Sequence, residues 1–256
     1  MEMLEPSVLI LLAIVAFAAG FIDAVAGGGG MLTIPALLAA GLPPHLALGT
    51  NKLSATFASS TAAFTYYRKK LFSPSYWKAS FWTTFVGAII GTLVVSQIST
   101  EWLDKILPLI ILATAIYSIV VRSKPGQENI LPEKTAAVTK KQKIQGFSLG
   151  FYDGVVGPGT GAFWTVSTMA LYKLNILLAS GVAKAMNFTS NITSLITFAI
   201  LGSIDWKLGL TMGVCLMAGA YLGAHSAIRF GAGFIRPVFV SVVTIMAIKL
   251  AYDAWF

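Results

Sequence analysis

Two aspartates stand inside apolar stretches of the chain, and a glycine-rich run follows each of them. Asp23 lies in residues 20–30 (GFIDAVAGGGG), and Asp153 lies in residues 150–161 (GFYDGVVGPGTG). A carboxylate at membrane depth costs at least about 2.5 kcal/mol, so it is retained where it has a partner or a task. Two interpretations stay open for each aspartate: a proton carrier, or a structural group that caps amides freed by the glycine break or pairs with a lysine.

Two lysines supply matching cations, Lys52 and Lys184, each about two turns into an apolar segment. Lys184 is followed by Asn187, Asn191 and Ser194 at spacings of three, four and three, which place all four on one helix face. A polar stripe on an apolar helix points into a helix bundle. These donors predict a site for a small anion. The alternative is a pair of buried Asp–Lys bridges, and both hold if the bridges exchange with substrate.

The glycine runs should break their helices, since each glycine lowers helix stability by about 1 kcal/mol. Helices that restart near Met31 and Ala162 would present free N–H groups to an anion, whereas the alternative is that the glycines only permit close packing. No strand precedes and no GKS/T follows either run, which excludes a nucleotide fingerprint. The proton-coupling candidates are Asp23 and Asp153, and the substrate-binding candidates are Gly28, Gly29, Gly30, Thr50, Asn51, Lys52, Gly159, Thr160, Gly161, Lys184, Asn187 and Asn191.

The segments that position these groups are strongly apolar. Hydrophobic residues make up 56% of the chain and charged residues 11%, with a mean hydropathy of +0.78, which excludes an ordinary soluble domain. Several apolar stretches approach the roughly 20 residues that span a bilayer. The net charge of +8 falls in short loops and not on a basic, aromatic-rich face, so no nucleic-acid partner is expected. The composition predicts an all-α polytopic membrane protein whose partners are the lipid bilayer and a small anion.

The first helix is expected at residues 8–26, retained and not cleaved as a leader, because the preceding residues lack a basic region. The next apolar piece, residues 31–40, would be about 15 Å long at 1.5 Å per residue, which is half a bilayer and predicts a re-entrant half-helix. Further helices of the first half are expected at residues 46–67, 77–98 and 103–121.

The pattern repeats at an offset of about 130 residues, which indicates a duplication. Beyond the two aspartate–glycine stretches, the matches are Gly49–Lys52 with Gly181–Lys184, Trp77 with Trp206, and the Gly87/Gly91 pair with Gly219/Gly223. We therefore expect one integral-membrane domain with a first repeat at residues 1–121, a linker at 122–143 and a second repeat at 144–256.

Loop charges predict the orientation of the two repeats. The loop at residues 68–70 and the linker, which holds six basic and two acidic residues, are placed in the cytoplasm, with both termini outside. The repeats then begin on opposite sides, which requires each broken segment to enter and leave on one side. The predicted fold is two inverted repeats, each a broken or re-entrant helical hairpin plus three transmembrane helices, a plan typical of secondary transporters with a midplane site.

Other motifs have structural interpretations. The Gly87/Gly91 and Gly219/Gly223 pairs predict helix contacts, with a homodimer interface as the alternative. Trp77, Trp102 and Trp206 are expected at the membrane–water interfaces. No Cys/His cluster, HExxH motif or Ser–His–Asp order occurs, so we expect neither an enzyme nor a metal site.

Residues 20–54, which contain D-x-x-x-GGGG-x-L-T-I-P-A-L and TNK, and the later G-F-Y-D-G-x-x-G-P-x-x-G resemble the TauE/SafE family of bacterial inner-membrane transporters. The resemblance covers essentially the whole chain. It implies transport, usually export, of a small sulfur oxyanion such as sulfite or an organosulfonate, without an organic cofactor. An anion channel or uniporter and a non-transporting scaffold are the alternatives. In the second half Ala183 replaces the asparagine that precedes Lys52, which predicts two chemically unequal half-sites.

Overall fold

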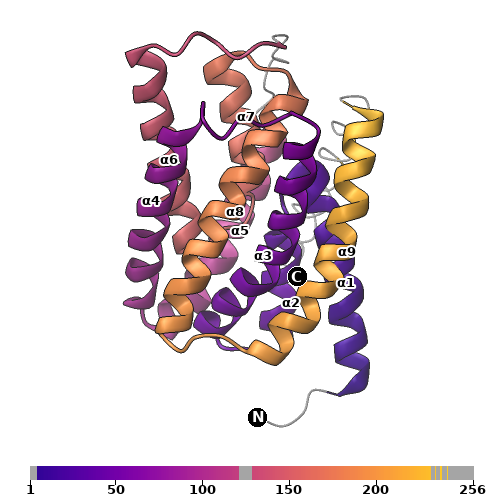
Figure 1. The fold of residues 1–256 in the computed structure, drawn as a ribbon. Helices are drawn as coiled ribbons and strands as arrows, with labels where there is room; N and C mark the ends of the chain where they lie inside the picture. Colours follow the sequence, from indigo (N-terminus) through magenta and orange to yellow (C-terminus); the bar gives the residue numbers. More distant parts are fainter. Residues whose placement is uncertain (1–4, 121–128, 232–233, 235–236, 238–240, 242–256) are drawn as a thin grey trace.

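The computed structural model describes residues 5–120, 129–231, 234, 237 and 241. These residues form helices without a β-strand, so the all-α prediction is confirmed (Figure 1). In chain order the helices are α1 (Pro6–Ala26), α2 (Gly30–Ala39), α3 (Pro44–Arg68), α4 (Lys78–Ser96), α5 (Thr100–Val120), α6 (Ala136–Val155), α7 (Thr160–Tyr172), α8 (Ile176–Ile200) and α9 (Trp206–Phe230). The apolar run at residues 238–251 lies outside the described residues, apart from Ser241.

Both glycine runs break the helices at the expected places. Helix α1 ends at Gly27, whose φ of +76° is a left-handed conformation that only glycine adopts without a Cβ penalty. Helix α2 begins at Gly30 and has 10 residues, so it measures about 15 Å. Helix α7 begins at Thr160 after Gly159, which also has a φ of +76°. The half-length helix and the two restarts are therefore confirmed to within two residues.

Helix α6 begins at Ala136, inside the segment expected to be a linker. The Thr135 hydroxyl accepts the backbone N–H of Val138 at 3.2 Å and so caps the first turn. Lys140 and Lys141 on the next turn are exposed, so their charges do not oppose helix formation. The exposure of Lys140 and Lys141 agrees with the basic composition of residues 122–143, but that composition did not indicate the start of the helix.

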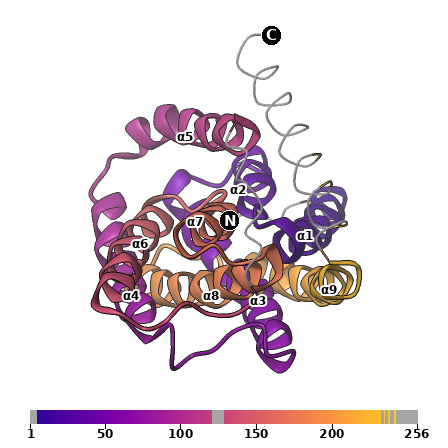
Figure 2. The same ribbon diagram turned by 90° about the horizontal axis from the view of Figure 1, so that it is seen from above.

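Helices α3 and α8 pack against each other in the middle of the molecule (Figure 2). Helix α1 lies along α9 on one side of them, and α6 lies along α4 on the other. The GxxxG pairs form these contacts: Gly87 and Gly91 approach α6 backbone, and the Gly219/Gly223 pair approaches α1 backbone. The helix-contact prediction is confirmed, because a Cβ on Gly87 would lie 2.5 Å from the Phe147 carbonyl oxygen.

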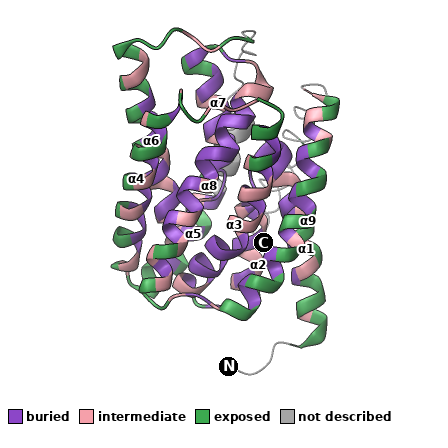
Figure 3. Cartoon of the chain, viewed as in Figure 1, coloured by how far each residue is buried: buried purple, intermediate pink, exposed green. Residues whose placement is uncertain are grey.

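The outer helices carry exposed apolar side chains, whereas the inner faces of α3 and α8 bury polar ones (Figure 3). Among the described residues α1, α4 and α9 are long and apolar enough to cross a membrane. Helices α3 and α8 have 25 residues each, or about 37 Å, which exceeds the roughly 30 Å of hydrocarbon. Their lower hydropathy reflects buried polar residues such as Asn51 and Asn191.

Trp77 departs from its expected place at a membrane interface. Its side chain is buried and meets the ring of Tyr172 edge-on at 5.0 Å. Trp102 and Trp206 are exposed, as interface residues would be. A loop position alone therefore did not distinguish a core tryptophan from an interfacial one.

Candidate functional site

The two helix breaks meet at the centre of the fold. The backbone of Gly27, after α1, touches that of Gly161, in the first turn of α7. A Cβ on Gly161 would lie 2.8 Å from the Gly27 Cα and 3.0 Å from the Asn187 Nδ2, so this crossing leaves no room for a side chain. The expectation of opposed breaks agrees with this contact.

Both lysines reach the aspartate that precedes the break in the other half of the chain. Lys52 Nζ lies 3.0 Å from Asp153 Oδ1 and donates to the Asp153 carbonyl oxygen at 2.5 Å. Lys184 Nζ lies 4.0 Å from Asp23 Oδ2 and donates to the Asp23 carbonyl oxygen. The bridges that the sequence left as an alternative are thus present, and each joins the first half to the second.

The two pairs have unequal surroundings. Lys52 and Asp153 have side-chain exposures of 1% and 3%, whereas Asp23 is 14% exposed. Removing a charge from water is expensive unless a partner and hydrogen bonds compensate for it. The Lys52–Asp153 pair is therefore the more strongly desolvated, and loss of either member leaves the other uncompensated.

Asp23 caps the first break. Its Oδ1 accepts the backbone N–H groups of Gly28 and Gly29, each at 3.2 Å. These amides lack helical partners because α1 has ended and α2 has not begun, so the carboxylate fills the role of a helix cap. The capping interpretation holds for Asp23 in this geometry.

Asp153 is bonded differently. Its Oδ1 accepts the Thr160 hydroxyl at 3.0 Å in addition to Lys52, and its Oδ2 is buried without a hydrogen-bond partner among the described residues. A buried polar atom without a partner costs about 1–3 kcal/mol. The unpaired oxygen is therefore a buried position where a proton would find an acceptor.

A cavity of about 30 Å³ lies beside the Lys52–Asp153 pair. It has room for only one or two water-sized groups. Eight of the expected site residues line it, namely Asp23, Gly29, Gly30, Asn51, Lys52, Asp153, Asn187 and Asn191. Its lining thus combines one lysine, two aspartates and three asparagine side chains with the backbone at the first break.

The other candidates lie outside the cavity lining. Thr50 is turned toward α9, where its hydroxyl accepts the Asp205 N–H at 2.9 Å. Lys184 reaches Asp23 instead of the cavity, and Thr160 holds Asp153. Gly28 serves the Asp23 cap, whereas Gly159 and Gly161 build the turn into α7 and its crossing with the first break.

Thr33, Gly157 and Leu216 line the cavity although they were not among the expected binding residues. Thr33 donates to Asn51 Oδ1 at 2.5 Å and so orients that side chain. Thr33 stands four residues after Gly29, one turn into the half-helix. This spacing places it on the same side as Gly29, so the sequence could have indicated it as a site residue. Leu216 offered none, because an apolar residue on α9 resembles its neighbours.

This arrangement places asparagine side chains, one lysine and two aspartates around a small space. A lysine that is released from its carboxylate can pair with an anion of similar size, and the asparagine amides can donate to its oxygens. Within the described part of the chain, no group of three or more His, Cys, Asp or Glu side chains could hold a metal ion. The geometry therefore suits reversible binding of a small anion.

Comparison with known proteins gives consistent results. Residues 12–250 match the family described as "Sulfite exporter TauE/SafE". The chain is 38% identical to the probable membrane transporter protein YfcA of Escherichia coli K12, over 98% of this chain and 93% of that protein. It is 40% identical to a probable membrane transporter protein of Haemophilus influenzae, over 97% and 96% of the two chains. No solved structure matches.

Proposed function

Because the chain belongs to the TauE/SafE family, whose members among its relatives are named as membrane transporters, we propose that it is a secondary transporter that exports a small sulfur oxyanion. One observation carries the proposal: two buried Asp–Lys contacts cross between the halves of the chain around one small polar cavity. Ionisable groups persist at membrane depth where they line a substrate path. Sulfite and organosulfonates are the substrates in view, and sulfite, as the smaller, requires the least widening of a cavity of about 30 Å³.

Lys52 is the proposed anion-binding cation, with Asn51, Asn187 and Asn191 donating to the oxygens of the substrate. Lys184 holds the opposite break through Asp23. The α2 N-terminus at Gly30 adds the positive end of a helix dipole. In this proposal the anion binds Lys52 only after the lysine has left Asp153.

The proposed fold is a pair of inverted repeats, α1–α5 and α6 onward, that move against each other. Two pairs of equivalent contacts between the halves support it. Helix α1 packs on α9 as α6 packs on α4, and Lys52 meets Asp153 as Lys184 meets Asp23. In this arrangement each half supplies a broken hairpin that seals the site from one side, so rocking would open the two sides in turn. We place the linker in the cytoplasm of an inner-membrane protein, with both termini outside.

We further propose that a proton is the coupling ion and that Asp153 carries it. The buried Oδ2 of Asp153 has no partner among the described residues, whereas Asp23 already serves two amides. A proton on Asp153 would remove the charge that holds Lys52 and so free the lysine for the anion. Departure of the anion and the proton would restore the pair.

The test is anion flux in liposomes that contain the purified protein. Sulfite, sulfate, thiosulfate and sulfonates would be offered as substrates with and without a pH gradient. We expect saturable sulfite flux that other substrates inhibit and that a pH gradient changes. Flux that rises linearly with concentration and ignores the gradient would instead indicate a channel or uniporter.

Lys52→Ala should abolish this flux, and Lys105→Ala is the matched control because it removes an exposed lysine on α5. If Lys52→Ala is folded and transports sulfite at the wild-type rate, the proposed site is wrong. A protein that shows no flux of any offered anion and no thermal shift with them would point to a scaffold.

A further inference from the structure

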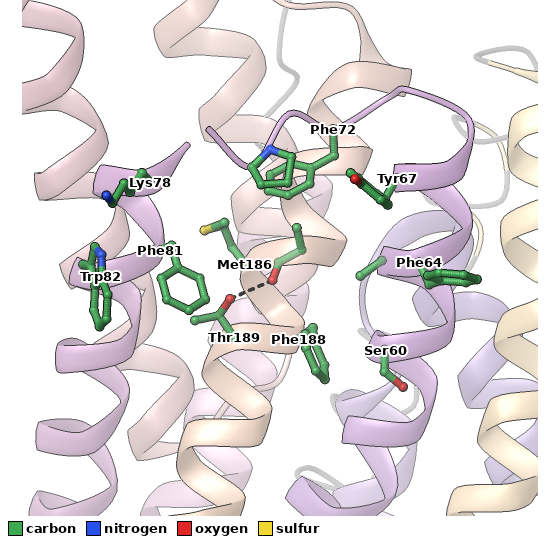
Figure 4. A pocket seen from close by; sticks show the side chains of 13 residues that line it. Ser60, Phe64, Tyr67, Phe72, Lys78, Phe81, Trp82, Met186, Phe188 and Thr189 are labelled. Atoms are coloured by element: carbon green, nitrogen blue, oxygen red, sulfur yellow. Dashed lines mark hydrogen bonds between the residues drawn. The ribbon is translucent and has the colours of Figure 1, made fainter. Parts of the chain in front are cut away.

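A second, much larger hollow lies on the lipid side of the molecule, away from the ion pairs. This groove of about 680 Å³ runs between α3, α4 and α8, and we call it the α3–α4–α8 groove (Figure 4). Its lining includes six aromatic side chains, namely Phe64, Tyr67, Phe72, Phe81, Trp82 and Phe188 (Figure 4). Its volume falls in the range of about 300–1,000 Å³ that is typical of ligand pockets.

The groove begins at the boundary between the membrane and water. It is roofed by Phe72 and Pro74 of the loop between α3 and α4, and irregular backbone of this kind is not tolerated against lipid tails. From Tyr67 it follows α3 to Ser60, which is seven residues or about 10 Å of helix. The hollow therefore covers the level of the glycerol backbone and the first part of an acyl chain.

A lysine lies at the open end of the groove. Lys78 lines it and is exposed, whereas Arg68 and Lys69, at the end of α3, line a different hollow beside α9. No acidic residue occurs between Asp23 and Glu101, so nothing in this stretch of sequence neutralises Lys78. Basic residues at such a place attract anionic lipid headgroups.

A second groove provides the contrast. It lies between α4 and α8 toward their opposite ends, has a volume of about 330 Å³, and is lined by apolar residues and two threonines without a charge. Both grooves lie between α4 and α8 and are mainly apolar, but of these two only the first has a cation, Lys78, in its lining.

We propose that the α3–α4–α8 groove binds an anionic phospholipid, with an acyl chain in the aromatic trough and the phosphate against Lys78. A second copy of this chain fits the groove less well. A two-fold dimer brings the same patch of both subunits together, so each Lys78 would approach a like charge and not an anion.

The experiment is native mass spectrometry of the detergent-solubilised protein, titrated with phosphatidylglycerol or phosphatidylcholine. We expect one tightly bound phosphatidylglycerol and weaker phosphatidylcholine. Lys78→Gln should weaken phosphatidylglycerol binding about fivefold, the effect of one basic residue near an anionic headgroup. Ala63→Trp, which fills the groove, should abolish the tight adduct, whereas Thr197→Trp, in the uncharged groove, should leave it unchanged.

Equal binding of the two lipids, or a tight phosphatidylglycerol adduct that survives Ala63→Trp, would overturn the proposal. A concentration-dependent dimer that Ala63→Trp abolishes would overturn it in favour of a second copy. Lys78 is exposed, so Lys78→Gln keeps the test valid even where the tryptophan variant does not fold.

Discussion

Removing one member of the Lys52–Asp153 pair should destabilise the protein more than removing both. The two charged atoms are 3.0 Å apart and both side chains are at most 3% exposed. A single substitution leaves a buried charge without its partner, which costs about 3–5 kcal/mol. We expect Lys52→Met and Asp153→Leu each to lower the free energy of unfolding by this amount, and the double variant to lose less than either.

For a chain of this length 1 kcal/mol corresponds to about 2–4 °C, so each single variant should unfold roughly 6–20 °C below wild type. Scanning calorimetry or tryptophan fluorescence in detergent would measure the shift, with Lys105→Met as an exposed control. The same proteins would be assayed for sulfite flux. Lys52→Met and the double variant should be inactive, because the proposed anion-binding cation is missing, and in Asp153→Leu any remaining flux should ignore a pH gradient, because the proposed proton carrier is missing.

Two results would refute this reasoning. Losses that add in the double variant would show that the two side chains do not interact. A double variant that regains both stability and flux would show that the pair only stabilises the fold. The Lys184–Asp23 pair gives an internal comparison, since its 4.0 Å separation and more exposed aspartate predict a smaller coupling.

Three further predictions concern the breaks and the helix contacts. In thermal unfolding, Gly41→Ala should lower the free energy of unfolding by about 1–2 kcal/mol, the penalty of its left-handed φ alone. Gly27→Ala should lower it more, because a Cβ on Gly27 meets the backbone of α7 and a Cβ on Gly41 meets nothing. Asp153→Asn should abolish the effect of a pH gradient on flux, whereas Asp23→Asn, which retains an acceptor for two amides, should preserve it. Gly91→Ile should lower the Tm without altering the mass measured by light scattering, because its side chain meets α6 of the same chain.

Local chemistry made part of this fold predictable. The breaks at Gly27 and Gly159 were visible because glycine runs cannot sustain a helix, and both glycines have positive φ. The spacing of Asn187 and Asn191 placed them on one face, and both line the cavity. Such features are determined by a few residues that are neighbours in the chain, so they can be inferred from a single sequence.

Other features depend on contacts between distant segments. Which lysine meets which aspartate is decided by how the end of α6 lies against α3 and the end of α1 against α8. The sequence could name the four groups but not their partners. Thr50 precedes Asn51, yet one step along a helix turns a side chain by about 100°. That rotation directs Thr50 to the loop before α9 and leaves Asn51 at the cavity.

The inequality of the two halves argues for a division of labour. Lys52 lines the cavity beside Asn51, whereas Lys184 follows Ala183 and is taken up by Asp23. Asp23 holds two backbone amides through Oδ1, whereas Lys184 lies 4.0 Å from Oδ2. Lys52 is held more tightly, by a 3.0 Å ion pair and a hydrogen bond to the Asp153 carbonyl oxygen. Of the two lysines, however, only Lys52 lines the cavity, so an anion bound there should compete with Asp153 for Lys52 and leave Lys184 in place.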